Sequence, residues 1–464
     1  MPHHALTIIG GGFSGTALAT YLLNRGGNGL DINIVEPRPS LGWGVAYGDA
    51  APFHILNVPA QRMSLWQNNA DGFLDWARRH GPRLGWAKAG SADGNTYLPR
   101  RLFGHYVAAE LDLALSQSKT VDGPRLVHHR TMVVDIQRKG DGYRVCLADG
   151  RDLPSDTIVL ATGFQAPLWP FPVTGRPDRL VANPWADSAL AGIGRDDDIL
   201  VVGTGLTMID MIYSLSRGGH RGKVTALSRH GHLPLVHGVW NPLAPLIQVE
   251  DAEKGIVSAL RRFRTRLRWG RADWRSAIDS LRPITDSLWQ ALPAADQDRF
   301  LRHLSPFWEV HRHRMPSESA DLLLKRVSQG RLAVTAAKIA EITGGSEDVQ
   351  VRYRPRHGNV EVTRHFHWVI NCTPPASPFD SRLDGLPQTL QRQQLARPHR
   401  TGLGFDAKLD GTLRDGHGHP IHGIFVLGPI RRGHAVEATA VPHIRPQLET
   451  LCGAILERSR RPQP

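Results

Sequence analysis

The chain has 464 residues, of which 41% are hydrophobic and 21% charged, a composition that excludes collagenous and wholly disordered proteins. Lys and Arg outnumber Asp and Glu by 56 to 43, so the net charge of +13 favours anionic partners such as phosphorylated cofactors. Cys146, Cys372 and Cys452 lie far apart, and no His or Cys spacing predicts a metal site, so a disulfide scaffold, a zinc ribbon and a dithiol centre are disfavoured. No apolar run reaches the roughly 18 residues that span a bilayer, and no secretory leader is recognisable, so we expect a cytoplasmic protein.

The chain opens with the pattern of a dinucleotide-binding unit. Its parts are an apolar strand (6–9), the turn GGGFSG (10–15), a helix-forming run (16–23) and a strand (32–35) that ends in an acid. Gly10 permits the tight turn, Gly12 lets the backbone approach a pyrophosphate, and Gly15 lets helix and strand pack closely. Glu36 lies 21 residues beyond Gly15, a spacing typical of a carboxylate that accepts hydrogen bonds from ribose hydroxyls.

A second copy of this pattern begins at residue 198. It comprises a strand (198–202), the turn GTGLTM (203–208), a helix (209–215) and a strand (224–227). The position that matches Glu36 is Arg229, which suits a 2′-phosphate and predicts NADP binding, with Ser228 donating a further hydrogen bond. The predicted NADP contacts are Gly203, Thr204, Gly205, Leu206, Thr207, Ser228 and Arg229. Met208 stands where Gly or Ala is usual, so we expect this helix to pack less tightly; a Rossmann-like unit without a ligand is the alternative.

The order of the remaining segments predicts an α/β protein with two Rossmann-like dinucleotide-binding domains, the second inserted in the first. Each glycine unit is followed by a meander and an apolar strand, and a last strand at 424–427 returns the chain to the first domain. We expect the first domain at 1–165 and 376–464, and the second at 195–242 and 329–375. Residues 243–328 break the repeat and are predicted to be a helical insertion, which we interpret as a lid over the cleft between the two dinucleotide units.

Within this insertion, residues 261–268 hold five arginines in eight positions. The favoured interpretation is the solvated face of a surface helix. An anionic partner is the alternative, although no nucleic-acid-binding signature accompanies the run, so nucleic acid is not an expected partner.

Two dinucleotide units in this order resemble the two-dinucleotide-binding-domain flavoproteins, in which the first unit holds FAD and the second NADPH. No redox cysteine pair follows the first acidic strand, which argues against the disulfide reductases of that superfamily. The segment HILNVPAQRMS (54–64) is instead similar to the active-site segment of flavin-containing monooxygenases, which implies that Asn57 lies beside the isoalloxazine; an Asx turn before Pro59 is the alternative. Residues 97–106 resemble the helix start of N-hydroxylating monooxygenases, whereas the Baeyer–Villiger fingerprint is absent.

Overall, the chain most resembles a bacterial family of predicted NAD(P)/FAD-binding proteins, on motifs such as GGGFSGT (10–16) and EATAVP (437–442). We expect residues 433–439 to form a helix whose N-terminus points at the flavin pyrimidine. The FAD contacts implied by the resemblance are Gly10, Gly12, Phe13, Ser14, Gly15, Glu36, Arg38, Trp43, Gly44, Met63, Val134, Thr162, Gly163, Gly428, Glu437 and Ala438.

The resemblance implies an FAD- and NADPH-dependent monooxygenase that oxygenates a nitrogen or sulfur nucleophile of a small molecule with dioxygen, through a C4a-hydroperoxyflavin. Two alternatives share every motif: an NADPH-dependent flavin reductase or dehydrogenase of another acceptor, and a non-catalytic redox sensor that binds both dinucleotides.

Overall fold

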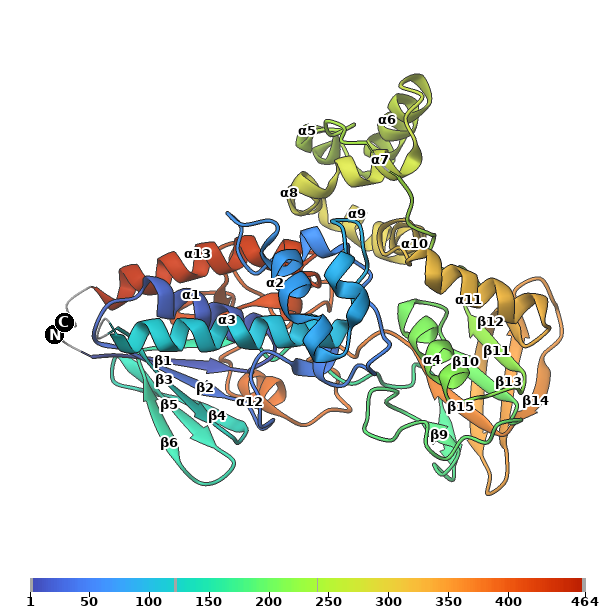
Figure 1. The fold of residues 1–464 in the computed structure, drawn as a ribbon, viewed down its shortest axis with the longest axis horizontal. Helices are drawn as coiled ribbons and strands as arrows, with labels where there is room; N and C mark the ends of the chain where they lie inside the picture. The colour runs from blue at the N-terminus through green and yellow to red at the C-terminus, as the bar shows by residue number, and fades with distance from the viewer. Residues whose placement is uncertain (1–2, 121–122, 240, 461–464) are drawn as a thin grey trace. The chain divides into compact units, whose positions relative to one another are not determined.

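The computed structural model describes residues 3–120, 123–239 and 241–460 (Figure 1). The chain forms two compact units: the first comprises Met1–Phe164 and Ser377–Pro464, and the second is Gln165–Ala376. No helix among the described residues is both long and apolar enough to cross a bilayer.

The first unit is built on a six-stranded sheet in the order β16-β17-β7-β1-β2-β3, in which only β16 runs antiparallel to its neighbour. Its strands are β1 (His4–Ile9), β2 (Leu30–Val35), β3 (Arg125–His129), β7 (Thr157–Leu160), β16 (Thr412–Arg414) and β17 (Pro420–Val426). Antiparallel β4 (Val133–Lys139), β5 (Gly142–Leu147) and β6 (Asp152–Ser155) form a separate sheet. The central strands β1 and β7 are rich in branched apolar residues and buried, as expected for parallel strands covered on both faces.

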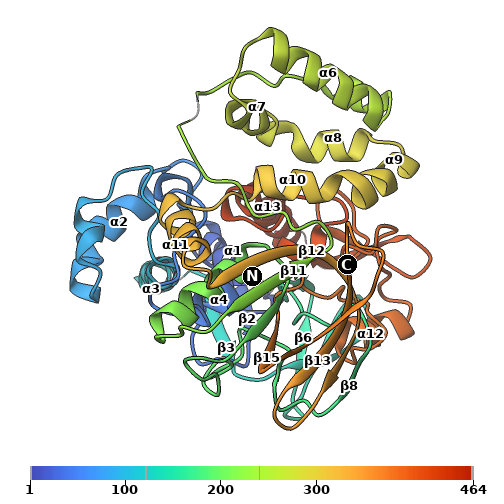
Figure 2. The ribbon, with the colours of Figure 1, turned by 90° about the vertical axis from the view of Figure 1, so that its right-hand side faces the viewer.

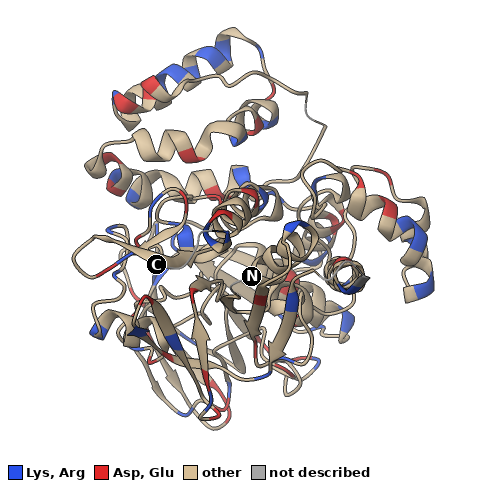
Figure 3. Ribbon diagram, turned by 90° about the vertical axis from the view of Figure 1, so that its left-hand side faces the viewer, with Lys and Arg blue, Asp and Glu red and all other residues tan. Residues whose placement is uncertain are grey.

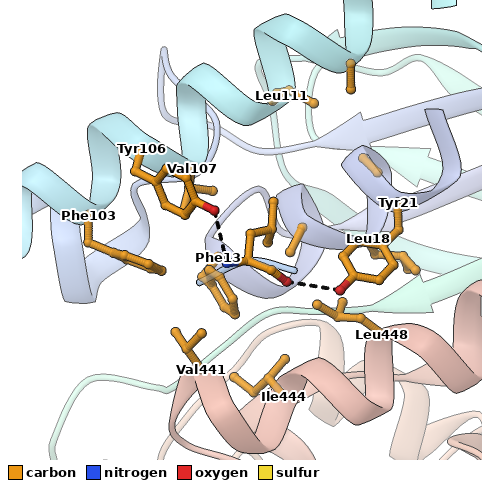
Figure 4. Close-up of a cluster of buried hydrophobic side chains, with 14 of the residues drawn as sticks. Phe13, Leu18, Tyr21, Phe103, Tyr106, Val107, Leu111, Val441, Ile444 and Leu448 are labelled. Carbon is orange, nitrogen blue, oxygen red and sulfur yellow. Dashed lines mark hydrogen bonds between the residues drawn. The ribbon is translucent and has the colours of Figure 1, made fainter. Parts of the chain in front are cut away.

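Most helices of the unit pack on one face of this sheet, and the three-stranded sheet packs on the other, together with Leu390 of the helix at Leu386–Arg392. The helices of the unit are α1 (Phe13–Arg25), α2 (Gly72–His80), α3 (Arg100–Thr120), α12 (Leu386–Arg392) and α13 (Val441–Ser459). In the core between α1, α3 and α13, Phe13 contacts Phe103, and Ile444 faces them from α13 (Figure 4). The Tyr21 hydroxyl donates to the Leu65 carbonyl at 3.0 Å, and the Leu65 N–H donates to the Tyr106 hydroxyl at 3.2 Å, so both buried phenols are satisfied.

The second unit contains an eight-stranded sheet in the order β14-β13-β12-β11-β10-β15-β9, with β8 paired to β12. Its strands are β8 (Val173–Gly175), β9 (Leu180–Val181), β10 (Ile199–Val202), β11 (Val224–Ser228), β12 (Leu332–Gly344), β13 (Val349–Pro355), β14 (Val362–Phe366) and β15 (Trp368–Asn371). The long strand β12 joins the two parts of the sheet, because its first half pairs in parallel with β11 and its second half pairs antiparallel with β13.

Two helices cover one face of the second sheet: α4 (Leu206–Arg217) and α11 (Ser317–Ser328). Met208 is fully buried there, and the first helical hydrogen bond of α4, from Ile209 to Gly205, is 3.4 Å long. The equivalent bond at the start of α1, from Thr16 to Gly12, is 3.0 Å long. The first hydrogen bond of α4 is therefore longer than that of α1, and the looser packing expected from Met208 stays a prediction.

Along the chain, the helical insertion lies between β11 and α11, and Figure 2 shows its helices. Its helices are α5 (Val249–Glu253), α6 (Ile256–Trp269), α7 (Trp274–Ser280), α8 (Thr285–Ala291), α9 (Ala294–Arg299) and α10 (Ser305–Arg312). It has a small core of its own, made by Ile247, Ala259, Leu281, Phe263, Leu288 and Trp308. It is tied to the rest of the unit by backbone hydrogen bonds from Leu235 to Val310 and from Met315 to Leu235.

Three boundaries differ from the sequence-based expectation. The second unit begins at Gln165 rather than 195, because β8 and β9 pair with β12 and β15. Helix α11 belongs to the Rossmann core rather than to the insertion, because Ala320 and Leu323 are buried in the same core cluster as α4. Residues 433–439 form turns instead of a helix; α13 begins only at Val441, where Pro442 occupies the first turn, a position that proline favours.

Candidate functional site

The first glycine turn connects β1 to α1 with two sterically required glycines. Gly10 has a φ of +107°, and a Cβ atom there would lie 2.5 Å from the Ala161 carbonyl oxygen. A Cβ atom on Gly15 would lie 2.0 Å from the Gly10 carbonyl oxygen. Gly12 is different, because a Cβ atom there would meet only the Gly44 Cα, at an ordinary contact distance of 3.6 Å. The protein's own packing therefore explains Gly10 and Gly15, and it leaves space at Gly12 for a ligand to approach the backbone.

Glu36 is fixed at the edge of this turn by main-chain hydrogen bonds. One carboxylate oxygen accepts from the Gly11 N–H at 2.8 Å, and the other accepts from the Arg38 N–H at 3.1 Å. The residue is 9% exposed, and each oxygen keeps acceptor capacity for a further donor. The carboxylate is thus held in place before any ribose hydroxyl reaches it.

Several other predicted FAD contacts gather around the turn. A Cβ atom on Gly428 would lie 2.4 Å from the Ser14 hydroxyl, so the end of β17 meets the first turn of α1. No side chain caps the N-terminus of α1, and Gly163 has open space where a Cβ would stand. The buried Thr162 hydroxyl has no hydrogen-bond partner in the described part of the chain. An uncapped helix N-terminus and an orphaned buried hydroxyl beside open glycines fit a phosphate-bearing dinucleotide.

The side chains of Phe13 and Met63 are placed in the hydrophobic core, with exposures of 7% and 2%. Phe13 can therefore reach a ligand mainly through its backbone N–H. Val134 is exposed at a bulge in β4, where the pairing with β5 shifts, so its backbone groups lie outside the regular ladder. Glu437 and Ala438 are buried, and Glu437 Oε2 lies 3.8 Å from His443 Nε2.

The remaining predicted residues of the first unit lie on the segments that follow β2. The rings of Trp43 and His105 meet edge-on, with 4.6 Å between their centroids. Arg38 forms an ion pair with Asp49, with 2.8 Å between Nη2 and Oδ2. Asn57 is half-buried in a loop that pairs with the segment before α3, through the hydrogen bond from Leu56 to Leu98. Its position beside a flavin stays a prediction.

The second glycine turn, between β10 and α4, repeats the geometry of the first. Gly203 has a φ of +112°, and a Cβ atom there would lie 2.3 Å from the Cys372 carbonyl oxygen, whereas nothing lies within 4 Å of a Cβ on Gly205. Leu206 and Thr207 begin α4, which no side chain caps at its N-terminus. The fully buried Asn371, at the end of β15, has a side-chain NH₂ with no partner among the described residues.

At the end of β11 the predicted phosphate contacts divide into two kinds. The Ser228 hydroxyl is engaged within the protein: it accepts from the Gly231 N–H at 2.9 Å and lies 2.9 Å from the Thr204 hydroxyl, which also donates to the His232 carbonyl at 2.5 Å. Arg229 is exposed and makes no hydrogen bond or ion pair with any described residue.

A second arginine, which the sequence analysis did not single out, lies beside the Arg229 loop. Arg356 follows β13 and contacts His230, with 2.5 Å between Nη1 and Nδ1. Burial, followed by the charges of Arg356, His232 and Arg229, holds the pKa of His230 below its usual range. Arg356 is 127 positions from Arg229, so only the pairing of the strands could reveal it.

The arginine-rich run forms the second half of α6 and is visible as blue segments along this helix in Figure 3. Two of its arginines hold the insertion together: Arg262 pairs with Asp251 at 2.7 Å, and Arg266 donates to the Leu246 carbonyl at 2.8 Å. Arg261, Arg264 and Arg268 are exposed. The run is therefore partly structural, and both a partner for it and the lid interpretation of the insertion stay predictions.

Comparison with known proteins bears on both units. Residues 7–165 match the sequence model of a family described as FAD-NAD(P)-binding. No protein of curated function matches the chain in sequence.

Among solved structures, the ornithine N-hydroxylase of Kutzneria sp. 744, with reduced FAD, NADP⁺ and L-ornithine, has a TM-score of 0.68 at 16% identity, covering 99% of this chain and 100% of that one. The L-lysine 6-monooxygenase of Pseudomonas syringae has a TM-score of 0.64 at 16% identity, covering 99% and 100%. The FAD-bound cadaverine monooxygenase of Erwinia amylovora has a TM-score of 0.64 at 15% identity, covering 100% and 97%. These similarities confirm the predicted α/β fold with two dinucleotide-binding units, and residues 7–165 form a domain of the FAD-NAD(P)-binding type.

Proposed function

We propose that the protein is an FAD-dependent, NADPH-using oxidoreductase that acts as a monooxygenase on a nitrogen nucleophile of a small molecule. The observation that carries the proposal is a pair of glycine turns of one geometry that end in opposite charges, Glu36 in the first unit and Arg229 in the second. The same fold, over the full length of the chain, serves enzymes named for the oxygenation of ornithine, lysine and cadaverine, all of which are amines.

In this proposal the first unit holds FAD. The open backbone at Gly12 and the uncapped start of α1 receive the pyrophosphate, and Glu36 accepts from the ribose hydroxyls. The Thr162 hydroxyl supplies a donor that nothing in the described protein uses. When bound, FAD supplies the redox chemistry that couples oxidation of NADPH to the reaction of dioxygen with the substrate.

The second unit holds NADPH in the corresponding way. Gly205 and the uncapped start of α4 receive its pyrophosphate, and Arg229 takes the place of a ribose-binding acid. A guanidinium can form two parallel hydrogen bonds to a phosphate, so it selects the 2′-phosphorylated cofactor.

The test is anaerobic reduction of the FAD-loaded protein with NADPH, followed by mixing with air in a stopped-flow spectrometer. A monooxygenase should return slowly to the oxidised flavin spectrum and, with the right amine, yield hydroxylated product in proportion to the NADPH consumed. Ornithine, lysine and cadaverine are the first substrates to try, each beside a thioether of similar length that tests for a sulfur nucleophile.

Immediate reoxidation with one hydrogen peroxide released per NADPH, whatever the substrate, would contradict the monooxygenase and favour the reductase or dehydrogenase. Binding of both dinucleotides with no flavin reduction would favour the sensor.

A further inference from the structure

We propose that Arg356 is a second recognition residue for the 2′-phosphate of NADPH, and that it forms a two-arginine clamp with Arg229 across the carboxyl end of β11. The inference rests on the proposed function, because it assigns a ligand to the second dinucleotide unit. It adds Arg356, which lies outside both the second glycine turn and β11.

The strand register brings the two arginines to one place. Ala336 of β12 pairs with Ser228, the residue before Arg229, and the Ala336 carbonyl accepts a hydrogen bond of 2.9 Å from the Arg356 N–H. The loop after β11 folds back over β12, since a Cβ atom on Gly231 would lie 3.1 Å from the Ala336 nitrogen. Arg229 directly follows β11 and Arg356 directly follows β13, the two strands that pair with β12. Both arginines therefore lie close to Ala336 of β12.

The contact with His230 shows how Arg356 is held. A guanidinium only donates hydrogen bonds, so at 2.5 Å the His230 Nδ1 must be the acceptor, and the imidazole must be neutral with its proton on Nε2. The lowered pKa of His230 agrees with this assignment. A neutral ring can orient the guanidinium without cancelling its charge.

Among the described residues, no carboxylate pairs with either arginine of the clamp. Neither Arg229 nor Arg356 forms an ion pair with an acidic residue in the described part of the chain, and no carboxylate is among the groups that shift the pKa of His230. Arg352, four residues earlier, shows the contrast: it is held between Glu341 at 2.7 Å and Glu361 at 2.6 Å. Two uncompensated guanidiniums on one edge suit a dianionic phosphate monoester, to which each can form charge-assisted hydrogen bonds.

The experiment measures binding to the FAD-loaded, full-length protein by calorimetry, with 2′,5′-ADP and NADP⁺ as phosphate-bearing probes and 5′-AMP and NAD⁺ as probes without the 2′-phosphate. Arg356→Ala should weaken 2′,5′-ADP and NADP⁺ by about ten- to a hundredfold and leave 5′-AMP and NAD⁺ within about twofold. The matched control is Arg354→Ala, which removes the same charge from an exposed position on β13 and should leave all four affinities within about twofold. Unchanged binding of 5′-AMP and NAD⁺ also shows that the variants are folded.

Each outcome bears on a different statement. If Arg229→Ala weakens NADP⁺ selectively while Arg356→Ala behaves like Arg354→Ala, the clamp is wrong and the proposed function stands. If both Arg356→Ala and Arg354→Ala weaken 2′,5′-ADP equally, the effect is general electrostatics and the clamp is again wrong. If the unmutated protein binds NADP⁺ no better than NAD⁺, the NADPH assignment fails, and the inference fails with it.

Discussion

Gly12 and Gly15 belong to the same turn but meet different surroundings, which gives a prediction that separates ligand binding from folding. Gly12→Val should lose FAD, because its side chain enters the space left for the pyrophosphate, whereas the apoprotein should keep a melting temperature close to that of the unmutated apoprotein. Gly15→Ala should instead destabilise the apoprotein by about 1–3 kcal/mol, because its Cβ would overlap the Gly10 carbonyl. Flavin absorbance per protein and thermal unfolding check both results, and stoichiometric FAD in Gly12→Val would show that the first unit is assigned wrongly.

Arg229 stands where the first glycine unit has Glu36, and we expect this side chain to set the cofactor preference. Arg229→Ala should weaken NADPH by about 1.5–3 kcal/mol, or roughly ten- to a hundredfold, and leave NADH nearly unchanged. Rates of flavin reduction with both nucleotides, in both proteins, measure this preference. Ser228→Ala is a useful companion: its hydroxyl holds Gly231 and Thr204, so we expect it to affect the two nucleotides alike. An unmutated protein that already prefers NADH would contradict the assignment.

His399 gives a pH dependence of stability in the first unit. Burial, followed by the neighbouring His434, lowers the pKa of His399 to about 4, although Asp406 opposes the shift. As the pH falls, His399 is protonated near pH 6.5 in the unfolded chain but only near pH 4 in the folded chain. The contribution of neutral His399 to the unfolding free energy is therefore fully present above pH 6.5 and falls as the pH drops from 6.5 to 4.

The matched variant for this prediction is His399→Asn, whose amide can replace the hydrogen bond between His399 Nδ1 and the Thr401 hydroxyl. Between pH 7 and 4.5, the unmutated protein should lose about 1–2 kcal/mol more of its unfolding free energy than the variant, after allowing for the partial exposure of the ring. Urea unfolding at the two pH values measures this difference. Equal losses in the two proteins would show that the folded state does not exclude a proton from His399.

At the scale of elements, we expect the buried carboxylate of Asp279 to stabilise the helical insertion. Asp279 of α7 accepts from Arg282 at 2.8 Å and from Arg314, and the side chains of Asp279 and Arg314 are 3% and 1% exposed. Asp279→Asn should destabilise the insertion by about 3 kcal/mol, because it leaves two arginines without a buried counter-charge. Hydrogen exchange should rise in residues 249–312 and stay unchanged in β10 and β11. The control is Asp196→Asn, whose pair with Arg221 is exposed and should contribute less than about 1 kcal/mol; equal effects of the two substitutions would contradict the prediction.

The sequence was most informative where local spacing determines the element. The glycine turns, the strands beside them and the acid and base that follow are encoded within about 30 residues, because these parts follow one another directly along the chain. The meanders were also predictable, since alternating apolar residues indicate strands.

What the sequence could not show depends on contacts between distant segments. Helix α11 has the same amphipathic pattern as the insertion helices, and only its burial against α4 assigns it to the Rossmann core. The extent of the second unit depends on β8 and β9, which are too short to predict without their partners. Arg356 reaches the Arg229 loop only through the register of β11, β12 and β13.

At the scale of the whole molecule, the second unit is inserted through two segments that run side by side. The Ala376 N–H donates to the Ala166 carbonyl at 3.4 Å, and Pro167 bridges to Pro375. The first unit therefore has its two chain ends close together, at Phe164 and Ser377. A shortened chain that joins these residues by a flexible linker of about four residues should fold and keep FAD while losing NADP⁺ binding. Flavin content and calorimetry with NADP⁺ test this; an insoluble or flavin-free product would show that the first unit needs the second to fold.

Glu36 and Arg229 occupy equivalent places after the two glycine turns, and in the proposed function each unit is a similar cradle for an adenine dinucleotide. Two such cradles on one chain create a sorting problem, because FAD and NADPH share the adenosine half by which they are held. We expect the opposite charges at the ends of β2 and β11 to solve it: the Glu36 carboxylate should repel a 2′-phosphate in the first unit, and Arg229 cannot accept hydrogen bonds from an FAD ribose in the second. On the proposed function, one side chain in each repeat thereby keeps two copies of the same architecture from competing for the same ligand.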